Sequence, residues 1–293
     1  MVARSRRPKL IVIVGPTASG KSSLAMRIAN TYGGEIIAAD SRTVYKGMDI
    51  GTAKSSRSDQ KKVPHWGLDL IDPDQRFTAY QFQKYAKSKI KDIQQRDKLP
   101  ILVGGTGLYI DAILFGFGFL PDADLDNRTK LGALNVLQLQ KIIENKGYKM
   151  PINSQNKRHL IRAIETEGKT GTKNPQPMTG TIVIGIMPQD DDLKNRIDLR
   201  AEQLFTGGVI EETKKLVKEY GEKVLERSGG IVYKICLKLI SGAINLEEAK
   251  ELDKIADWQY ARRQRTWFKR NPYIKWFADG DQAFRSISGQ LNT

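Results

Sequence analysis

The chain has 293 residues, enough for one large domain or two modest ones, and its 40% hydrophobic and 28% charged residues are typical of a soluble globular protein. One cysteine and two histidines exclude an internal disulfide, a multi-cysteine zinc site and a histidine-rich metal centre, and no apolar run approaches the roughly 20 residues of a membrane-spanning helix. The net charge of +15 favours a polyanionic partner such as nucleic acid.

The N-terminal residues MVARSRRPK are basic and lead directly into an apolar strand. They contain no apolar signal core and no cleavage site, so we expect a cytoplasmic protein that has no membrane contact.

The first third of the chain alternates apolar strands with amphipathic helices. Such alternation predicts a parallel sheet with helices on both faces. Between two of these elements lies a long segment rich in Gly, Asp, Ser and Pro, which is typical of a functional loop with short pieces of structure. In chain order, we expect a strand at 9–14, a helix at 22–31, a strand at 35–39, the long loop at 41–76, a helix at 78–97 and a strand at 99–103.

The character of the sequence changes after Pro121. Residues 122–170 are polar and helical in pattern, whereas TIVIGIM at 181–187 is one more buried strand. Helices with glycine breaks then fill 190–270, and YIKWF at 273–277 is a last short strand. We therefore expect a core domain formed by 1–120 and 171–293, and a small helical insertion domain at 121–170.

The stretch GPTASGKS at 15–22 fits the phosphate-binding P-loop, with the strand before it and the helix after it that this motif requires. Its backbone N–H groups and the helix N-terminus point at phosphate oxygens, and Lys21 supplies a positive charge. The Ser22 hydroxyl suits Mg²⁺, which prefers oxygen ligands. The residues expected to bind the phosphates are Gly15, Pro16, Thr17, Ala18, Ser19, Gly20, Lys21 and Ser22.

The acidic strand end that usually binds Mg²⁺ in an ATPase is not evident, because the strand at 99–103 runs into Gly104-Gly105-Thr106. Asp40 is the only acidic residue at a strand end near the loop, at the edge where ligands of open parallel sheets bind. It is a candidate metal contact or general base. A turn or helix-capping aspartate is the alternative interpretation.

Five motifs, in order and spacing, resemble the tRNA dimethylallyltransferases, also called tRNA isopentenyltransferases. The resemblance covers about the whole chain. The motifs are GPTASGKS (15–22), ADSRTVYKGMDIGTAK (39–54), VPHWGLDLIDPD (63–74), PILVGGTGLYIDAIL (100–114) and ARRQRTWFKR (261–270).

The resemblance implies a P-loop NTPase-like α/β fold and a Mg²⁺-dependent transfer of a dimethylallyl group from dimethylallyl diphosphate to N6 of the adenosine at tRNA position 37. The loop at 15–22 then holds the leaving diphosphate, and no ATP hydrolysis is implied. Asp40 matches the family's general base, Thr106 a residue at the reacting end of the channel, and Arg196 an arginine near the diphosphate. Arg200, four residues later, lies on the same helical face.

The resemblance also implies contacts to the tRNA anticodon stem-loop, and we expect a monomeric enzyme. The helical insertion is expected to lean over the anticodon stem. For Trp267 and Phe268, next to the basic residues of the C-terminal signature, packing in the core is the favoured interpretation. The expected tRNA contacts are Asp40, Ser41, Arg42, Thr43, Thr106, Arg128, Arg158, Arg162, Arg262, Arg263 and Gln264.

The sequence departs from the family pattern at several positions. Thr43 stands where glutamine is usual, Trp66-Gly67 replaces a commoner His-Leu, and His159 replaces a frequent arginine. Gly229 and Val232, in GGIVYK, replace a polar tRNA contact and a glycine. These changes affect the expected tRNA contacts and leave the donor site intact.

Three other functions remain open from the sequence. An adenylate isopentenyltransferase would use the same donor with a free nucleotide as the acceptor, a small-molecule P-loop kinase would turn over ATP, and an RNA-binding P-loop protein would use a nucleotide as a switch. The basic C-terminal half and RRQRTWF favour tRNA.

Overall fold

The computed structural model describes residues 8–120 and 124–291 of the chain. They divide into two compact units, with boundaries after Leu114 and before Pro177. The first unit holds the sheet and most helices, and the second is the segment Phe115–Gln176. The sequence placed the insertion at 121–170, a range that lies within this second unit and includes 121–123, which are outside the described residues.

The first unit is built on a parallel six-stranded sheet in the order β3-β2-β4-β1-β5-β6. The expected α/β fold with a parallel sheet is therefore confirmed. Its strands are β1 (Leu10–Val14), β2 (Gly34–Ala38), β3 (His65–Trp66), β4 (Leu99–Gly104), β5 (Thr181–Ile186) and β6 (Lys275–Phe277).

The central strand β1 is buried along its whole length, which explains its unbroken apolar sequence LIVIV. Val14 is in register with Gly104 of β4 on one side and with Gly185 of β5 on the other. The loops that follow β1, β2 and β4 consequently open at the same edge of the sheet.

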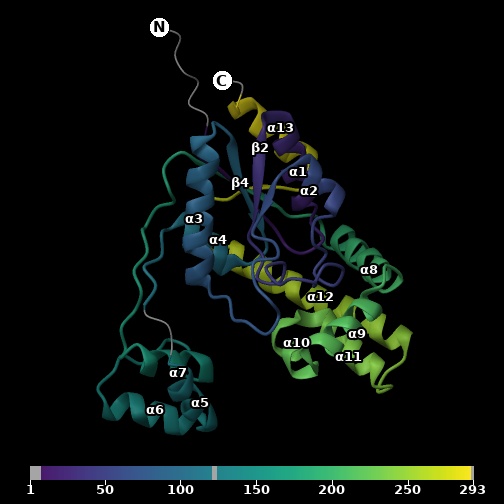
Figure 1. Ribbon diagram of the computed structural model, residues 1–293. Helices are drawn as coiled ribbons and strands as arrows, with labels where there is room; N and C mark the ends of the chain where they lie inside the picture. Colours follow the sequence, from purple (N-terminus) through teal and green to yellow (C-terminus); the bar gives the residue numbers. More distant parts are fainter. Residues whose placement is uncertain (1–7, 121–123, 292–293) are drawn as a thin grey trace. The chain divides into compact units, whose positions relative to one another are not determined.

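Helices cover both faces of this sheet (Figure 1). Helices α1 (Lys21–Tyr32) and α13 (Gly280–Leu291) pack on one face, where Leu24, Ile28 and Ile287 join the strand residues in one core. Helices α3 (Ala79–Gln95) and α4 (Gly107–Leu114) pack on the other. The C-terminal helix α13 was not anticipated from the sequence.

Local signals explain where several helices begin and end. Gly33 ends α1 in the left-handed region, with φ of 65°, and Thr78 caps α3 in a capping box with Gln81. The glycine breaks expected within 190–270 separate α8 (Asp190–Thr206), α9 (Val209–Tyr220), α10 (Glu222–Ser228), α11 (Gly230–Ile240) and α12 (Leu246–Phe268). The expected long loop contains β3 and the short helix α2 (Arg57–Lys62).

The second unit is helical, as the sequence predicted. Its helices α5 (Leu125–Ala133), α6 (Val136–Asn145) and α7 (Lys157–Glu165) enclose a small core of Leu131, Leu139, Ile143, Leu160, Ile161 and Ile164. No helix in the described parts of the chain is both long and apolar enough to span a membrane.

Candidate active site

Two glycine-containing loops meet at the carboxyl edge of the sheet. The first glycine loop, residues 15–20, joins β1 to α1, and the second, residues 104–107, joins β4 to α4. Gln264 of α12 links them: its Oε1 accepts a hydrogen bond from the Thr17 N–H at 2.8 Å, and its Nε2 donates to the Gly105 carbonyl at 3.0 Å. The Gln264 side chain is buried.

The first glycine loop has the features of an anion cradle. The N-terminus of α1 leaves backbone N–H groups without partners inside the helix, directly after the loop. The Lys21 Nζ donates to the Pro16 carbonyl at 2.9 Å and so lies over the loop. Burial lowers the Lys21 pKa to about 8; Asp40 and Asp257 oppose this shift, and Arg200 adds to it.

Two arginines of α8 reach the same loop. Arg196, the residue favoured from the sequence, is exposed and donates to the Ser19 carbonyl at 3.3 Å. Arg200 is half-buried and donates to the Thr17 hydroxyl at 2.5 Å. Because i and i+4 positions share a helical face, both guanidinium groups lie at the loop where a bound anion would need charge.

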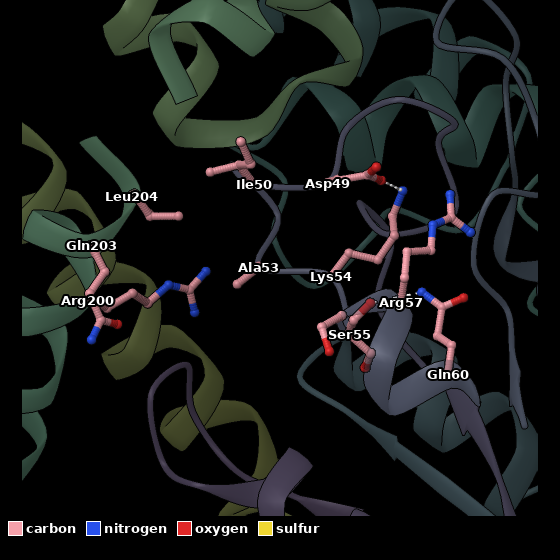
Figure 2. A pocket seen from close by; sticks show the side chains of 11 residues that line it. Asp49, Ile50, Ala53, Lys54, Ser55, Arg57, Gln60, Arg200, Gln203 and Leu204 are labelled. Atoms are coloured by element: carbon pink, nitrogen blue, oxygen red, sulfur yellow. Dashed lines mark hydrogen bonds and ion pairs between the residues drawn. The ribbon is translucent and has the colours of Figure 1, made fainter. Parts of the chain in front are cut away.

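Arg200 also forms part of a pocket of about 290 Å³ between α8 and the segment 49–60. Figure 2 shows Arg200, Gln203 and Leu204 on one wall, and Asp49 to Gln60 on the other. The pocket therefore adjoins the first glycine loop through the Arg200 side chain.

Asp40 follows β2 and lies at the same edge of the sheet. Its Oδ1 accepts a hydrogen bond from the Arg42 N–H at 2.7 Å, while within the described residues no hydrogen bond reaches Oδ2. Asp40 raises the pKa of two neighbouring tyrosines: burial and then Asp40 raise that of Tyr260 to about 12, and burial, Tyr45 and Asp40 raise that of Tyr109. Asp40 is therefore half-buried and lies near both tyrosines.

Thr106 in the second glycine loop joins the Asp40 segment. Its Oγ1 accepts a hydrogen bond from the Ser41 N–H at 3.0 Å, and its own N–H donates to the Ala39 carbonyl at 3.2 Å. The predicted residues Asp40, Ser41, Thr106 and the first glycine loop therefore come from three strand ends that meet at one edge.

Other predicted tRNA contacts are buried or hydrogen-bonded within the protein. Arg42 donates to the Ser228 carbonyl at 2.8 Å, and Thr43 is buried. The Gln264 side-chain amide forms hydrogen bonds with both glycine loops. Their roles toward tRNA remain predictions, whereas their roles in the architecture of the site are visible.

A basic groove of about 610 Å³ lies along the end of α12. Trp267 is 38% exposed there, and its indole lies so close to Gly107 that a Cβ at that position would be 2.3 Å from Cδ1. The expected core packing is therefore confirmed for Phe268, which is fully buried, and is wrong for Trp267, which remains exposed at the groove. The groove next to the second glycine loop is lined by Gln259, Arg262, Arg263, Thr266, Trp267 and Arg270.

In the second unit, the three predicted arginines differ in their surroundings. Arg128 and Arg162 both approach the buried Glu165 carboxylate, at 3.6 and 3.3 Å. Arg158 is exposed on α7. Only Arg158 therefore presents its charge without an acidic partner in the described part of the chain.

Sequence reasoning missed Glu212, which holds the segment 49–51. Its carboxylate accepts hydrogen bonds from the N–H groups of Asp49, Ile50 and Gly51 at 2.8–3.0 Å, and from the Tyr233 hydroxyl at 2.5 Å. Glu212 is one of two adjacent glutamates at the start of α9, and no local pattern distinguishes it from the exposed Glu211.

The residues at the first glycine loop fit a Mg²⁺ ion that arrives with a diphosphate. Ser22 is exposed at the first turn of α1 and offers a hydroxyl oxygen. The described residues contain no group of three or more acidic, histidine or cysteine side chains able to hold a metal alone. The remaining ligands would be water and phosphate oxygens, the arrangement typical of Mg²⁺.

Comparisons with known proteins agree with this picture. The model of the IPP transferase family matches residues 43–271. The tRNA dimethylallyltransferase of Staphylococcus epidermidis is 36% identical over 98% of this chain and 92% of its own length. That of Thermoanaerobacter sp. is 38% identical over 97% of this chain and 99% of its own.

Solved structures are similar as well. The tRNA isopentenylpyrophosphate transferase of Bacillus halodurans superimposes with a TM-score of 0.73 at 35% identity, and 97% of each chain is covered. A eukaryotic dimethylallyltransferase acting on tRNA has the same fold, with a TM-score of 0.75 at 23% identity over 97% of this chain and 77% of its own.

Proposed function

Because the chain belongs to the IPP transferase family, whose members include the tRNA dimethylallyltransferases, we propose that it transfers a dimethylallyl group from dimethylallyl diphosphate to N6 of the adenosine at tRNA position 37. The observation that carries the proposal is the meeting of a phosphate cradle, a carboxylate and a basic groove at one edge of the sheet.

The first glycine loop binds the diphosphate of the donor. Its N–H groups, Lys21, Arg196 and Arg200 offer positive charge where the leaving group gains negative charge. When bound next to Ser22, Mg²⁺ would neutralise part of that charge.

Asp40 acts as the general base. As the bond between N6 and the allylic carbon forms and the carbon–oxygen bond to diphosphate breaks, the N6 proton passes to the Asp40 carboxylate. Hydrogen bonding of Oδ1 to the Arg42 N–H fixes the orientation of the carboxylate. The Thr106 hydroxyl accepts a hydrogen bond from the Ser41 N–H and so positions the segment that carries Asp40.

The tRNA binds to the basic groove through its phosphates, and the exposed Trp267 face provides a stacking surface for an unstacked base. The anticodon loop suits this, because the bases of a loop can leave their stack at low cost. Arg128, Arg158 and Arg162 of the second unit are assigned to the anticodon stem, and Ser22 to Mg²⁺. We further propose a monomeric, cytoplasmic enzyme.

The test offers labelled dimethylallyl diphosphate and Mg²⁺ with each of three acceptors: unmodified tRNA with adenosine at position 37, the same tRNA with guanosine there, and AMP. Label in the first acceptor alone is the expected result. Label in AMP would instead indicate an adenylate isopentenyltransferase. In a parallel reaction with ATP and Mg²⁺, ATP hydrolysis by a protein that transfers no prenyl group would indicate a kinase or a nucleotide switch.

A further inference from the structure

Two acidic residues of α12, Asp253 and Asp257, lie one helical turn apart and face the core of the first unit. Asp253 is 1% exposed, and the Asp257 side chain is 13% exposed. Buried carboxylates are costly unless they have a partner of opposite charge. The partner here is Arg200 of α8, whose Nε lies 3.8 Å from the Asp257 Oδ2.

Arg200 thus stands between an acid and the phosphate cradle. Its Nη1 donates to the Thr17 hydroxyl at 2.5 Å, while its Nε, which is buried, makes no hydrogen bond. The Asp257 contact at 3.8 Å is therefore an ion pair without a hydrogen bond, and it restrains the Nε side of the guanidinium.

The same helix holds Thr17 from a second side. Asp257 and Gln264 are seven residues apart on α12, which is two helical turns and hence one face. Through Gln264 the helix binds the Thr17 N–H, and through Asp257 it approaches the arginine bound to the Thr17 hydroxyl. The Thr17 N–H is therefore bound directly by α12, and the Thr17 hydroxyl is linked to α12 through Arg200 of α8.

We propose that Asp257 is a positioning residue for the donor site: it orients Arg200 so that the guanidinium lies on the first glycine loop, ready for the diphosphate. This inference rests on the proposed function, because it takes the ligand of that loop to be the donor diphosphate. Asp257 itself does not contact the ligand and acts through Arg200.

Asp257 has two opposing effects on anion binding. The inference can therefore be tested by whether replacing Asp257 weakens or strengthens diphosphate binding. A negative charge near the loop repels diphosphate, whereas orientation of Arg200 favours it. We expect orientation to be the larger effect, because the charged hydrogen bonds of a guanidinium lose most of their strength when their geometry is lost.

Asp253 is the neighbouring carboxyl on the same helix and forms no ion pair within the described residues. Burial and the neighbouring Asp257 raise the Asp253 pKa to about 7, with Arg200 opposing, and its Oδ2 has no hydrogen-bond partner. Burial also raises the pKa of Asp257, but Arg200 and Lys21 oppose the shift. At pH 6 Asp253 is mostly neutral, so Asp253→Asn is a matched control on the same helix.

The experiment measures the Kd of inorganic diphosphate with Mg²⁺ at pH 6 by calorimetry. The proteins are the wild type, Asp257→Asn, Arg200→Ala, the double variant and Asp253→Asn. We expect Asp257→Asn to weaken binding about tenfold and Asp253→Asn to leave it within about twofold. In the Arg200→Ala background, Asp257→Asn should no longer weaken binding, since only repulsion remains to be removed.

Steady-state kinetics supply the second readout. Asp257→Asn should raise the KM for dimethylallyl diphosphate and leave the KM for tRNA unchanged, with a melting temperature close to that of the wild type. Unchanged or tighter diphosphate binding in Asp257→Asn, or equal weakening in both Arg200 backgrounds, would overturn the inference alone. A wild type that binds no diphosphate would overturn both the inference and the donor site.

Discussion

The Gln264 side chain accepts a hydrogen bond from the backbone N–H of Thr17 at 2.8 Å, across 247 residues of sequence. With its other amide atom it donates to the Gly105 carbonyl, so that one buried side chain sets the spacing of the two glycine loops. The reaction needs the leaving group and the acceptor base at a fixed separation, and this bridge is placed to provide it.

Replacing Gln264 should therefore reduce transfer and stability together. Gln264→Leu leaves the Thr17 N–H and the Gly105 carbonyl without partners and should cost about 2–3 kcal/mol of unfolding free energy. Gln264→Glu retains an acceptor for Thr17 but places a carboxylate against the Gly105 carbonyl. Chemical denaturation and kcat for tRNA prenylation measure both effects, and full activity in Gln264→Leu would contradict a positioning role.

Substitutions of Asp40 and Lys21 should impair different steps of the reaction. Asp40→Asn keeps an oxygen for the Arg42 N–H but cannot take the N6 proton, so transfer should fall about 10²–10⁴-fold with donor and tRNA binding retained. Lys21→Ala should instead lose donor binding. Single-turnover transfer and diphosphate calorimetry separate the two, and unchanged turnover in Asp40→Asn would remove the base assignment.

Local patterns in the sequence predicted the strands and helices that carry the candidate site. GPTASGKS identified the loop and helix around Lys21, and the strand end at 35–39 placed Asp40 at the correct edge, because both depend on neighbours in the chain. Gln264 binds residues 159 and 247 positions away, and Glu212 binds residues 161 to 163 positions away. Asp257 contacts Arg200, which is 57 positions away. Such long-range partners leave no local periodicity, so only the folded chain reveals them.

Glu212 should be a major source of stability for the segment 49–51. Glu212→Gln keeps the shape but turns an NH₂ group toward backbone donors, which should cost about 2–3 kcal/mol. Glu211→Gln, at the exposed neighbour, is the matched control and should change stability by less than about 0.5 kcal/mol. Equal effects of the two substitutions in urea denaturation would argue against this role.

The packing of Gly51 against Tyr233 provides a second test of the role of the segment 49–51. A Cβ at this position would lie 2.6 Å from the Tyr233 ring, whose hydroxyl donates to Glu212. Gly51→Ala should therefore destabilise the protein by about 1–3 kcal/mol through overpacking. Gly51→Ala combined with Tyr233→Leu, which removes the ring, should lose less than the sum of the two single changes; additive losses in urea denaturation would show that the two residues do not interact.

Substitutions of Arg158 and Arg162 in the second unit should have different effects, one on tRNA binding and the other on stability. Arg158→Ala should weaken tRNA binding and reduce the slope of log K against log salt by about 0.7–0.9, with no change in melting temperature. Arg162→Ala removes one of two arginines from the buried Glu165 and should lower the stability of this unit by about 1–3 kcal/mol. Salt-dependent filter binding and thermal unfolding provide the measurements, and a stability loss in Arg158→Ala would contradict the assignment.

The buried charge of Lys21 should lower the stability of the free enzyme at neutral pH. Its pKa is about 8 in the folded chain against 10.5 for an ordinary lysine, so the folded state holds the proton less tightly than the unfolded state. The penalty is complete below pH 8, decreases as pH rises from 8 to 10.5, and vanishes above that range. The penalty is at most about 3 kcal/mol.

Lys21→Met should accordingly raise the melting temperature of the free protein at pH 7, and the difference from the wild type should shrink between pH 8 and 10.5. Saturating diphosphate should reverse the order at pH 7, because only the wild type gains stability from binding the anion. A Lys21→Met protein that is less stable than the wild type both with and without diphosphate would contradict this account. It would show that Lys21 stabilises the folded loop, and that its charge does not destabilise the free protein.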